Sequence, residues 1–160
     1  MKNWLIIFWF LLLGILLVQC KKEVVVRPEN EVTLLVDKIN LLRQSGCNCG
    51  AIYMPPVPLL SVNMSLQTAA TAHAKDMAQK NYFDHLSPAG GTPEERVINA
   101  GYTGEFRAEN LAKGYGKADE VIAAWRNSPS HCKAMMDAKS IEAGAGMAQN
   151  YWVITFGASR

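Results

Sequence analysis

The order of the hydrophobic patterns along this chain constrains its fold more than any other feature. Apolar residues at the three- and four-residue spacing of amphipathic helices dominate the segments up to Trp125. β-branched and aromatic residues concentrate near the end, from Tyr151 to Phe156. A parallel βαβ array would alternate strands with helices. Helices that come first and strands that come mostly last predict instead an α+β domain built in layers.

Capping residues and glycines set the expected boundaries of these elements. The clearest boundary is at Thr92, because Pro93 and Glu95 complete a capping box there. The Gly and Pro content of residues 46–60 excludes a regular helix and predicts an ordered loop pinned by cysteine. The expected helices span Glu31 to about Gly46, Asn63 to about Asn81, Thr92 to Gly101 and Asp119 to Trp125, with a helical turn at 128–132; an extended segment at 104–116 and a hairpin that turns near Gln149 and Asn150 complete the pattern.

The first thirty residues predict export and anchoring. Lys2 precedes an unbroken apolar run at 4–18, which is followed closely by Cys20. This pattern resembles a bacterial lipoprotein signal, in which cleavage before the cysteine leaves an acylated Cys20. An uncleaved membrane anchor is the alternative, although the run is slightly shorter than the roughly 20 residues of a spanning helix. We expect a signal peptide at 1–19, a lipidated cysteine with its tether at 20–30, and one extracytoplasmic domain at 31–160.

The charge balance excludes one broad class of function. The formal net charge at pH 7 is +2, and the chain contains no basic run. Nucleic-acid-binding domains present clusters of Lys and Arg to the phosphate backbone. We therefore expect no nucleic-acid partner. The expected partner at the N-terminus is the membrane, reached through the lipid on Cys20.

Three cysteines remain for the domain once Cys20 is assigned to the lipid: Cys47, Cys49 and Cys132. An oxidising compartment favours disulfides, and Cys47 and Cys49 are too close in sequence to bridge each other easily. We predict that Cys132 pairs with Cys49, with Cys47 as the alternative partner, and that the third cysteine stays free. A structural zinc site made of the three cysteines and His131 is the competing hypothesis.

Several segments of the chain carry a resemblance to a known family. In order along the sequence they are "AATAHAKDMAQKNYFDHLSPAGGTPEERVINAGY", "AENLAKGYG", "VIAAWRNSPSHCKAMM" and "EAGAGMAQNYWVITFG". They closely resemble the CAP superfamily of cysteine-rich secretory proteins, antigen 5 and plant pathogenesis-related proteins, and most strongly its bacterial secreted branch. The resemblance covers about Glu31 to Gly157. It implies a three-layer α-β-α sandwich with a large cleft.

The resemblance also implies which residues line that cleft. They are His85 in "FDHLSP", Glu109 in "AENLA" and His131 in "SPSHC", and in the family such residues can hold a divalent metal, often zinc. Two imidazoles and one carboxylate are a three-ligand set that leaves a fourth position for water. The family's fuller set has a second glutamate, and no acidic residue lies between Trp125 and Cys132 to supply it. We expect His73, on the apolar face of its helix, to be a hydrogen-bonded core residue.

These residues favour a binding domain over an enzyme. A metal-bound water needs a general base for hydrolysis, and we find no second carboxylate to act as one. The favoured function is therefore a lipid-anchored, non-enzymatic module whose cleft binds a divalent metal, zinc or another cation, and a small, lipidic or sterol-like ligand. The alternative is a metal-dependent, peptidase-like hydrolase of the cell envelope. A purely structural or adhesive domain is the third hypothesis.

Overall fold

The computed structural model describes residues 30–159, so the predicted signal peptide, Cys20 and the tether before Asn30 lie outside the described residues. Within residues 30–159, no helix combines the length and the apolar character needed to cross a bilayer. The elements in chain order are α1 (Glu31–Ser45), β1 (Cys47–Cys49), β2 (Ile52–Met54), β3 (Ser61–Val62), α2 (Met64–Lys80), α3 (Pro93–Asn99), β4 (Glu105–Lys113), α4 (Ala118–Asn127), α5 (Pro129–Met135), β5 (Glu142–Ala148) and β6 (Tyr151–Ala158).

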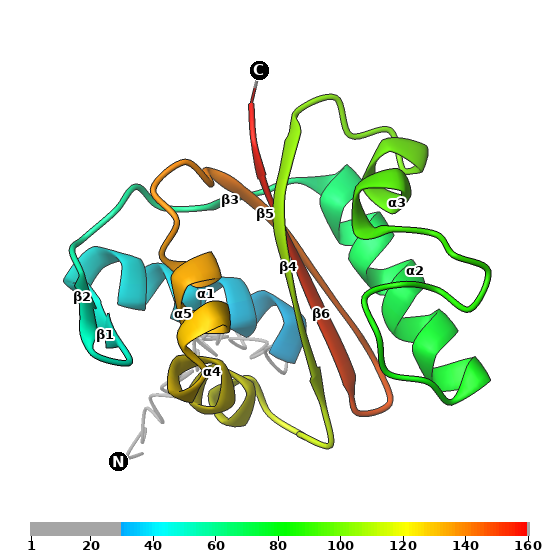
Figure 1. The fold of residues 1–160 in the computed structure, drawn as a ribbon, viewed down its shortest axis with the longest axis horizontal. Coiled ribbons are helices and arrows are strands. Elements are labelled where there is room, and N and C mark those ends of the chain that lie inside the picture. Colours follow the sequence, from blue (N-terminus) through cyan, green and yellow to red (C-terminus); the bar gives the residue numbers. More distant parts are fainter. Residues whose placement is uncertain (1–29, 160) are drawn as a thin grey trace, which may run out of the picture.

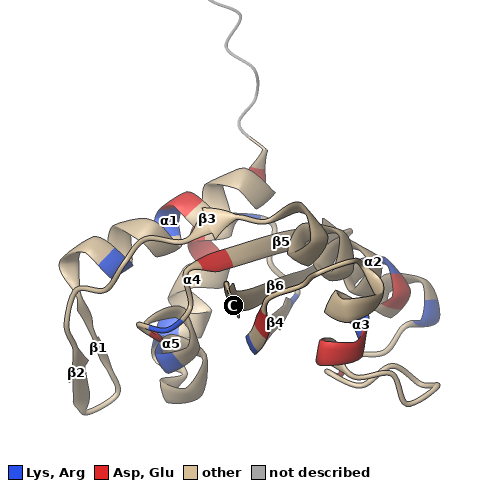
Figure 2. Ribbon diagram, turned by 90° about the horizontal axis from the view of Figure 1, so that it is seen from above, with Lys and Arg blue, Asp and Glu red and all other residues tan. Residues whose placement is uncertain are grey.

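These elements form three layers. The middle layer is a four-stranded sheet in the order β3-β5-β6-β4. Helices α2 and α3 lie on one side of the sheet, and α1, α4 and α5 lie on the other (Figure 1). The view from above shows the same separation of the two helical layers (Figure 2). The arrangement confirms the predicted α+β fold and its α-β-α sandwich.

The expected helices are present at nearly their expected boundaries. The Asn30 side chain accepts from the backbone amide of Val32 at the start of α1. The capping box at Thr92 is formed as predicted, with Pro93 in the first turn of α3. At the end of α2, Asn81 adopts the left-handed conformation with φ of 51°. Local signals therefore define these helix ends without help from the rest of the fold.

The loop expected at residues 46–60 contains a short ribbon that the pattern did not predict. Strands β1 and β2 pair antiparallel, with Cys47 opposite Met54 and Cys49 opposite Ile52. β3 was also missed, and it pairs in parallel with β5 through Ser61 and Glu142. Strands of two or three residues are too short to show a hydrophobic period, so only tertiary pairing reveals them.

The sheet holds α2 at close range because two glycines on β5 face the helix. A Cβ atom added to Gly144 would clash with the backbone of Leu66 and Gln67, and one added to Gly146 would clash with the backbone of Thr71. The α2 face is itself small, since it includes buried alanines such as Ala70. The two glycines are therefore required for α2 to pack this closely against the sheet.

A buried arginine joins the other helical layer to the loops around it. The guanidinium of Arg43, on α1, has no exposed surface and donates to four backbone carbonyls, those of Pro58, Met135, Asp137 and Ser140. Burial lowers the pKa of Arg43 to about 10, although the Asp137 carboxylate partly opposes this shift. These bonds fix the end of α5 relative to α1. No local pattern in the sequence indicates that a charged residue such as Arg43 lies on the buried face of α1.

Replacing Gly144 by Ala tests the close approach of α2 to the sheet. We expect Gly144→Ala to lower the free energy of unfolding by about 3 kcal/mol, because α2 must move away from β5 to accommodate the methyl group. Urea unfolding followed by circular dichroism measures this loss. The matched control is Gly116→Ala, where the nearest atom to an added Cβ is Glu120 Oε2 at 4.0 Å; there we expect a change below about 0.5 kcal/mol. Equal effects of the two substitutions would contradict the proposed constraint.

Candidate functional site

Glu109 and His85 come together at the open edge of the sheet. Glu109 lies within β4, which is an edge strand, and His85 lies in the segment between α2 and α3. The Nδ1 atom of His85 is 2.9 Å from Oε1 of Glu109. The Glu109 side chain is only 2% exposed, whereas that of His85 is 48% exposed. The carboxylate thus lies beneath the imidazole, and the imidazole faces outward.

An arginine that the sequence analysis did not identify completes this cluster. The Nη2 atom of Arg96, on α3, lies 3.0 Å from each carboxylate oxygen of Glu109. The same guanidinium donates to the backbone carbonyls of His85 and Gly91. A buried carboxylate needs a charged partner to offset its lost hydration, and Arg96 supplies it. The capping box places Arg96 on α3, but no local pattern indicates that it faces β4.

His131 approaches the same edge from the opposite helical layer. It is half-buried on α5, and the Asn110 side chain donates to its backbone carbonyl at 3.0 Å. Because consecutive residues of a strand point to opposite faces, Glu109 reaches the segment of His85 while Asn110 reaches α5. Asn110 thus ties β4 to α5 through its side chain. The two histidines therefore flank β4 from its two sides.

The pKa of His131 lies below the ordinary value of 6.5. Burial is the main cause, and the electrostatic effect of the nearby His85 lowers it further. The imidazole of His131 is consequently neutral at pH 7. A neutral imidazole is the form that binds metal ions.

The predicted ligand set has a specific arrangement in this structure. Both oxygens of Glu109 accept hydrogen bonds from Arg96, and Oε1 also lies against His85. Among the described residues, the ligand atoms of His85, Glu109 and His131 do not gather as a group within 4.8 Å; the three cysteines do. The Glu109 carboxylate is therefore engaged by Arg96 and lies against Nδ1 of His85. A carboxylate behind a ligating histidine is a frequent arrangement in metal sites.

A cavity of about 290 Å³ adjoins His131. Its walls are largely apolar and aromatic, with Phe83 before the His85 segment, Tyr115 after β4 and Trp125 on α4. The cavity also has polar groups at Lys113, Ser128 and His131. A largely apolar wall with a small number of polar groups is typical of sites that bind small molecules.

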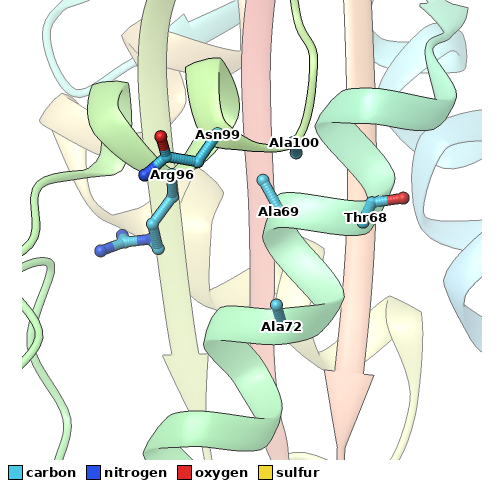
Figure 3. Close-up of a pocket in the computed structure, with 6 residues that line it drawn as sticks. All are labelled: Thr68, Ala69, Ala72, Arg96, Asn99 and Ala100. Atoms are coloured by element: carbon cyan, nitrogen blue, oxygen red, sulfur yellow. The ribbon is translucent and has the colours of Figure 1, made fainter.

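A second cavity, of about 300 Å³, lies between α2 and α3 and is lined by Thr68, Ala69, Ala72, Arg96, Asn99 and Ala100. Figure 3 shows that the guanidinium of Arg96 points away from the alanines of α2. Because that guanidinium binds Glu109, Arg96 belongs both to the wall of this cavity and to the His85 cluster.

His73 has the core position that the sequence predicts. It is 1% exposed, and its Nε2 atom lies 2.9 Å from the backbone carbonyl of Asp84, immediately before His85. Its Nδ1 atom lies 3.4 Å from the Tyr82 hydroxyl, which donates to Asp76. His73 thus anchors the segment that carries His85. Burial is the largest cause of its lowered pKa.

A disulfide joins Cys49 to Cys132, with the two Cα atoms 5.4 Å apart and the two residues 83 positions apart in sequence. This is the pairing preferred in the sequence analysis, and Cys47 is free and buried. Because Cys132 follows His131, the disulfide attaches the β1–β2 ribbon to the helix that carries the histidine. A sulfur occupied in a disulfide cannot serve as a thiolate ligand, so the Cys₃His zinc site does not describe this form of the protein.

Comparison with known sequences identifies a family match over most of the chain. The model of the cysteine-rich secretory protein family, CAP, matches residues 36–156. The uncharacterised protein YkwD of Bacillus subtilis is 35% identical over 91 residues, which are 57% of this chain and 35% of YkwD. The uncharacterised membrane protein YlbC of the same organism is 29% identical over 54% of this chain and 25% of YlbC. The chain thus spans well under half the length of either relative.

Solved structures show the same fold. An extracellular protein from Bacillus anthracis that contains an SCP domain has a TM-score of 0.72 and 24% identity, over 80% of this chain and 40% of that chain. An outer surface protein from Borrelia burgdorferi has a TM-score of 0.69 and 22% identity, over 84% of this chain and 97% of that chain. At these identities the likeness concerns the arrangement of the backbone alone.

Substituting Arg96 tests the pairing beneath His85. We expect Arg96→Met to lower the free energy of unfolding by about 3 kcal/mol, because it leaves the buried Glu109 carboxylate without its main partner. The double variant Arg96→Met with Glu109→Gln should recover part of this loss. Chemical unfolding of the three proteins provides the measurement. Arg126→Met, at an exposed position of α4, is the control and should change stability by less than about 0.5 kcal/mol.

The lowered pKa values of His73 and His131 predict a pH dependence of stability. In the folded protein both values lie below 6.5. Below pH 6.5 the unfolded chain therefore binds more protons at these two residues than the folded chain does, and the free energy of unfolding falls as the pH decreases from 7 to 5. NMR titration of the imidazole Cε1 protons should give midpoints below 6.5 for both residues. A midpoint above 6.5 for either one would contradict its assigned burial effect.

Proposed function

This chain belongs to the CAP family of cysteine-rich secretory proteins, and from that premise we propose that it is a non-enzymatic binding domain held outside the cytoplasm. Its cleft binds a divalent metal through His85 and His131 and a small or lipidic ligand in the adjoining cavity. The observation that carries this proposal is the state of Glu109, whose two oxygens are both engaged by Arg96.

The arrangement around Glu109 supports binding rather than hydrolysis. A general base must accept a proton from water, so the carboxylate or imidazole that serves as the base needs a free lone pair directed at that water. Glu109 is 2% exposed and points at Arg96 and His85. A peptidase-like hydrolase would require this carboxylate to leave its arginine. Breaking the Glu109–Arg96 ion pair costs free energy, and this cost favours the non-enzymatic function.

The two imidazoles support a metal as the cleft's inorganic ligand. With Nδ1 of His85 held by Glu109, its Nε2 atom is the nitrogen directed to a ligand. The lowered pKa of His131 keeps its imidazole in the neutral form at pH 7. Zinc accepts imidazole nitrogen readily, and a two-histidine site leaves its other positions for water or for a ligand donor.

The neighbouring cavity supports an organic ligand with a large apolar part. Phe83, Tyr115 and Trp125 contribute aromatic surface beside His131, and the volume of about 290 Å³ suits a small molecule or part of a lipid chain. Lys113 adds a positive charge at the wall, which would attract a carboxylate or phosphate group on such a ligand. A sterol-like or other lipidic ligand meets these requirements.

The proposed location rests on the sequence and on the printed descriptions of related proteins. The N-terminal pattern that ends at Cys20 supports export and a lipid anchor, with the membrane as the partner at that end. The similar structures come from an extracellular protein and from an outer surface protein. A disulfide in the domain suits an oxidising compartment.

Zinc titration of the purified protein tests the metal site. Isothermal calorimetry should detect one zinc ion per chain, and His85→Ala and His131→Ala should each abolish this binding. Glu109→Gln should weaken it about 10- to 100-fold, because the carboxylate orients His85 from behind. Glu94→Gln, an exposed position on α3, is the matched control and should leave the affinity unchanged.

Two results would overturn the metal assignment. Failure of the wild-type protein to bind zinc, cobalt or manganese would remove the metal from the proposal. Zinc binding that survives both histidine substitutions would assign the ion to other residues, with the cysteine cluster as the first to examine.

A further inference from the structure

Three sulfur atoms meet between the β1–β2 ribbon and α5. Cys47 and Cys49 are alternate residues of β1 and therefore point to the same side of the strand, toward Cys132 on α5. The Sγ atom of Cys47 is 3.8 Å from Sγ of Cys132, which is already bonded to Cys49. All three sulfurs lie within 4.8 Å of one another. A free thiol is thus in van der Waals contact with one sulfur of a disulfide.

We propose that these residues form an internal thiol–disulfide exchange site. The Cys47 thiol loses its proton to water, and the thiolate attacks Sγ of Cys132. A Cys47–Cys132 bond forms as the Cys49–Cys132 bond breaks, and the released Cys49 thiolate takes up a proton. One disulfide and one thiol are present before and after the step, so no external oxidant or reductant is needed. The domain therefore has two disulfide-bonded forms.

The geometry of the ribbon makes both forms accessible. Within the described residues, β1 pairs only with β2, through three residue pairs, and neither strand joins the central sheet. Because Cys47 and Cys49 point to the same side of β1, no change of strand register is needed, and the Cys47 sulfur must move roughly 2 Å to reach bonding distance from Cys132 and to line up with the Cys49–Cys132 bond. Few hydrogen bonds in a ribbon of three residue pairs resist such a displacement.

The surroundings confine the exchange to these three residues. Cys47 is 7% exposed, Cys49 is 1% exposed and Cys132 has no exposed surface. Met136 is buried in the same cluster, and the partly buried side chains of Leu42, Met54 and Val57 pack against it. Thiols dissolved in water therefore reach the sulfurs slowly, whereas the internal thiol is already in contact. The exchange preserves a covalent link between the ribbon and α5.

The exchange also bears on the cleft. Cys132 immediately follows His131 on α5, and Asn110 holds the carbonyl of His131 to β4. Bonding Cys132 to Cys47 in place of Cys49 changes the point on β1 to which this helix is tied. In the two disulfide forms α5 is therefore tied to β1 at different residues, and the His131 that it carries is held differently at the cleft.

Disulfide mapping of the purified, non-reduced wild-type protein tests the proposal. The protein is held at pH 8, acidified to stop exchange, unfolded in guanidinium chloride at pH 4, alkylated with N-ethylmaleimide and digested for mass spectrometry. We expect the label on Cys47 in one fraction of the molecules and on Cys49 in the other, with Cys132 disulfide-bonded in both. A label on only one of Cys47 and Cys49 after prolonged incubation at pH 8, or on all three cysteines, overturns the proposal.

Two single substitutions provide the matched pair of locked forms. Cys47→Ser retains Cys49 as the partner of Cys132, and Cys49→Ser leaves Cys47 as the partner. We expect both variants to contain one disulfide, with no free thiol at the two domain cysteines that remain, when labelled thiols are mapped by mass spectrometry in denaturant. A Cys49→Ser protein that folds but keeps Cys47 and Cys132 as free thiols overturns the proposal, since Cys47 would then be unable to reach Cys132. The wild-type mapping stands independently if that variant fails to fold.

The same pair of variants tests the link to the cleft. The NMR resonance of the His131 Cε1 proton should differ between Cys47→Ser and Cys49→Ser, because α5 is tied to β1 at different residues. The resonance of His73, which lies on α2, is the internal control and should coincide in the two proteins. Identical His131 resonances would show that exchange does not reach the cleft.

Discussion

The buried guanidinium of Arg43 makes the contacts on which the position of α5, and with it His131, depends. It comes from α1 and donates to carbonyls at the end of α5, in the segment between α5 and β5 and in the segment between β2 and β3, so it fixes a helix that makes few contacts with the sheet. An aliphatic side chain at this position would leave those carbonyls unsatisfied in the core. Because α5 carries His131 and Cys132, the positions of both the His131 imidazole and the disulfide depend on this arginine.

A second buried charge organises the segment that carries His85. Glu109 lies under His85 with Arg96 as its partner, and this pairing determines what the carboxylate can do. An acidic residue in a conspicuous motif is easily assigned as a ligand or a base. Here Arg96 binds both of its oxygens, and one of them also lies against Nδ1 of His85. The proposal of a binding domain rather than a hydrolase therefore rests on the neighbours of one side chain.

The fold could be predicted from the sequence because its signals are local. The capping box at Thr92, the Asn63 cap of α2 and the terminal hairpin appear within segments of a few residues, and each is present in the structure. Arg43 and Arg96 could not be identified in this way. The carbonyls that Arg43 binds are 15 to 97 residues away in sequence, and Glu109, the partner of Arg96, is 13 residues away. A charged residue on a helix ordinarily faces water, so nothing local indicates these contacts. The β1–β2 ribbon was missed because three-residue strands have no readable period.

The sequence by itself determined the helices, the final hairpin, the layered fold class and the residue types available for chemistry, since periodicity and capping act over short distances. It also identified the cysteines that could pair. Only the tertiary structure decided that β4 is an edge strand, with His85 and His131 flanking it from opposite layers. Likewise, only the tertiary structure put the free Cys47 sulfur 3.8 Å from a disulfide sulfur. These features are contacts between residues distant in the chain, and the packing of layers creates them.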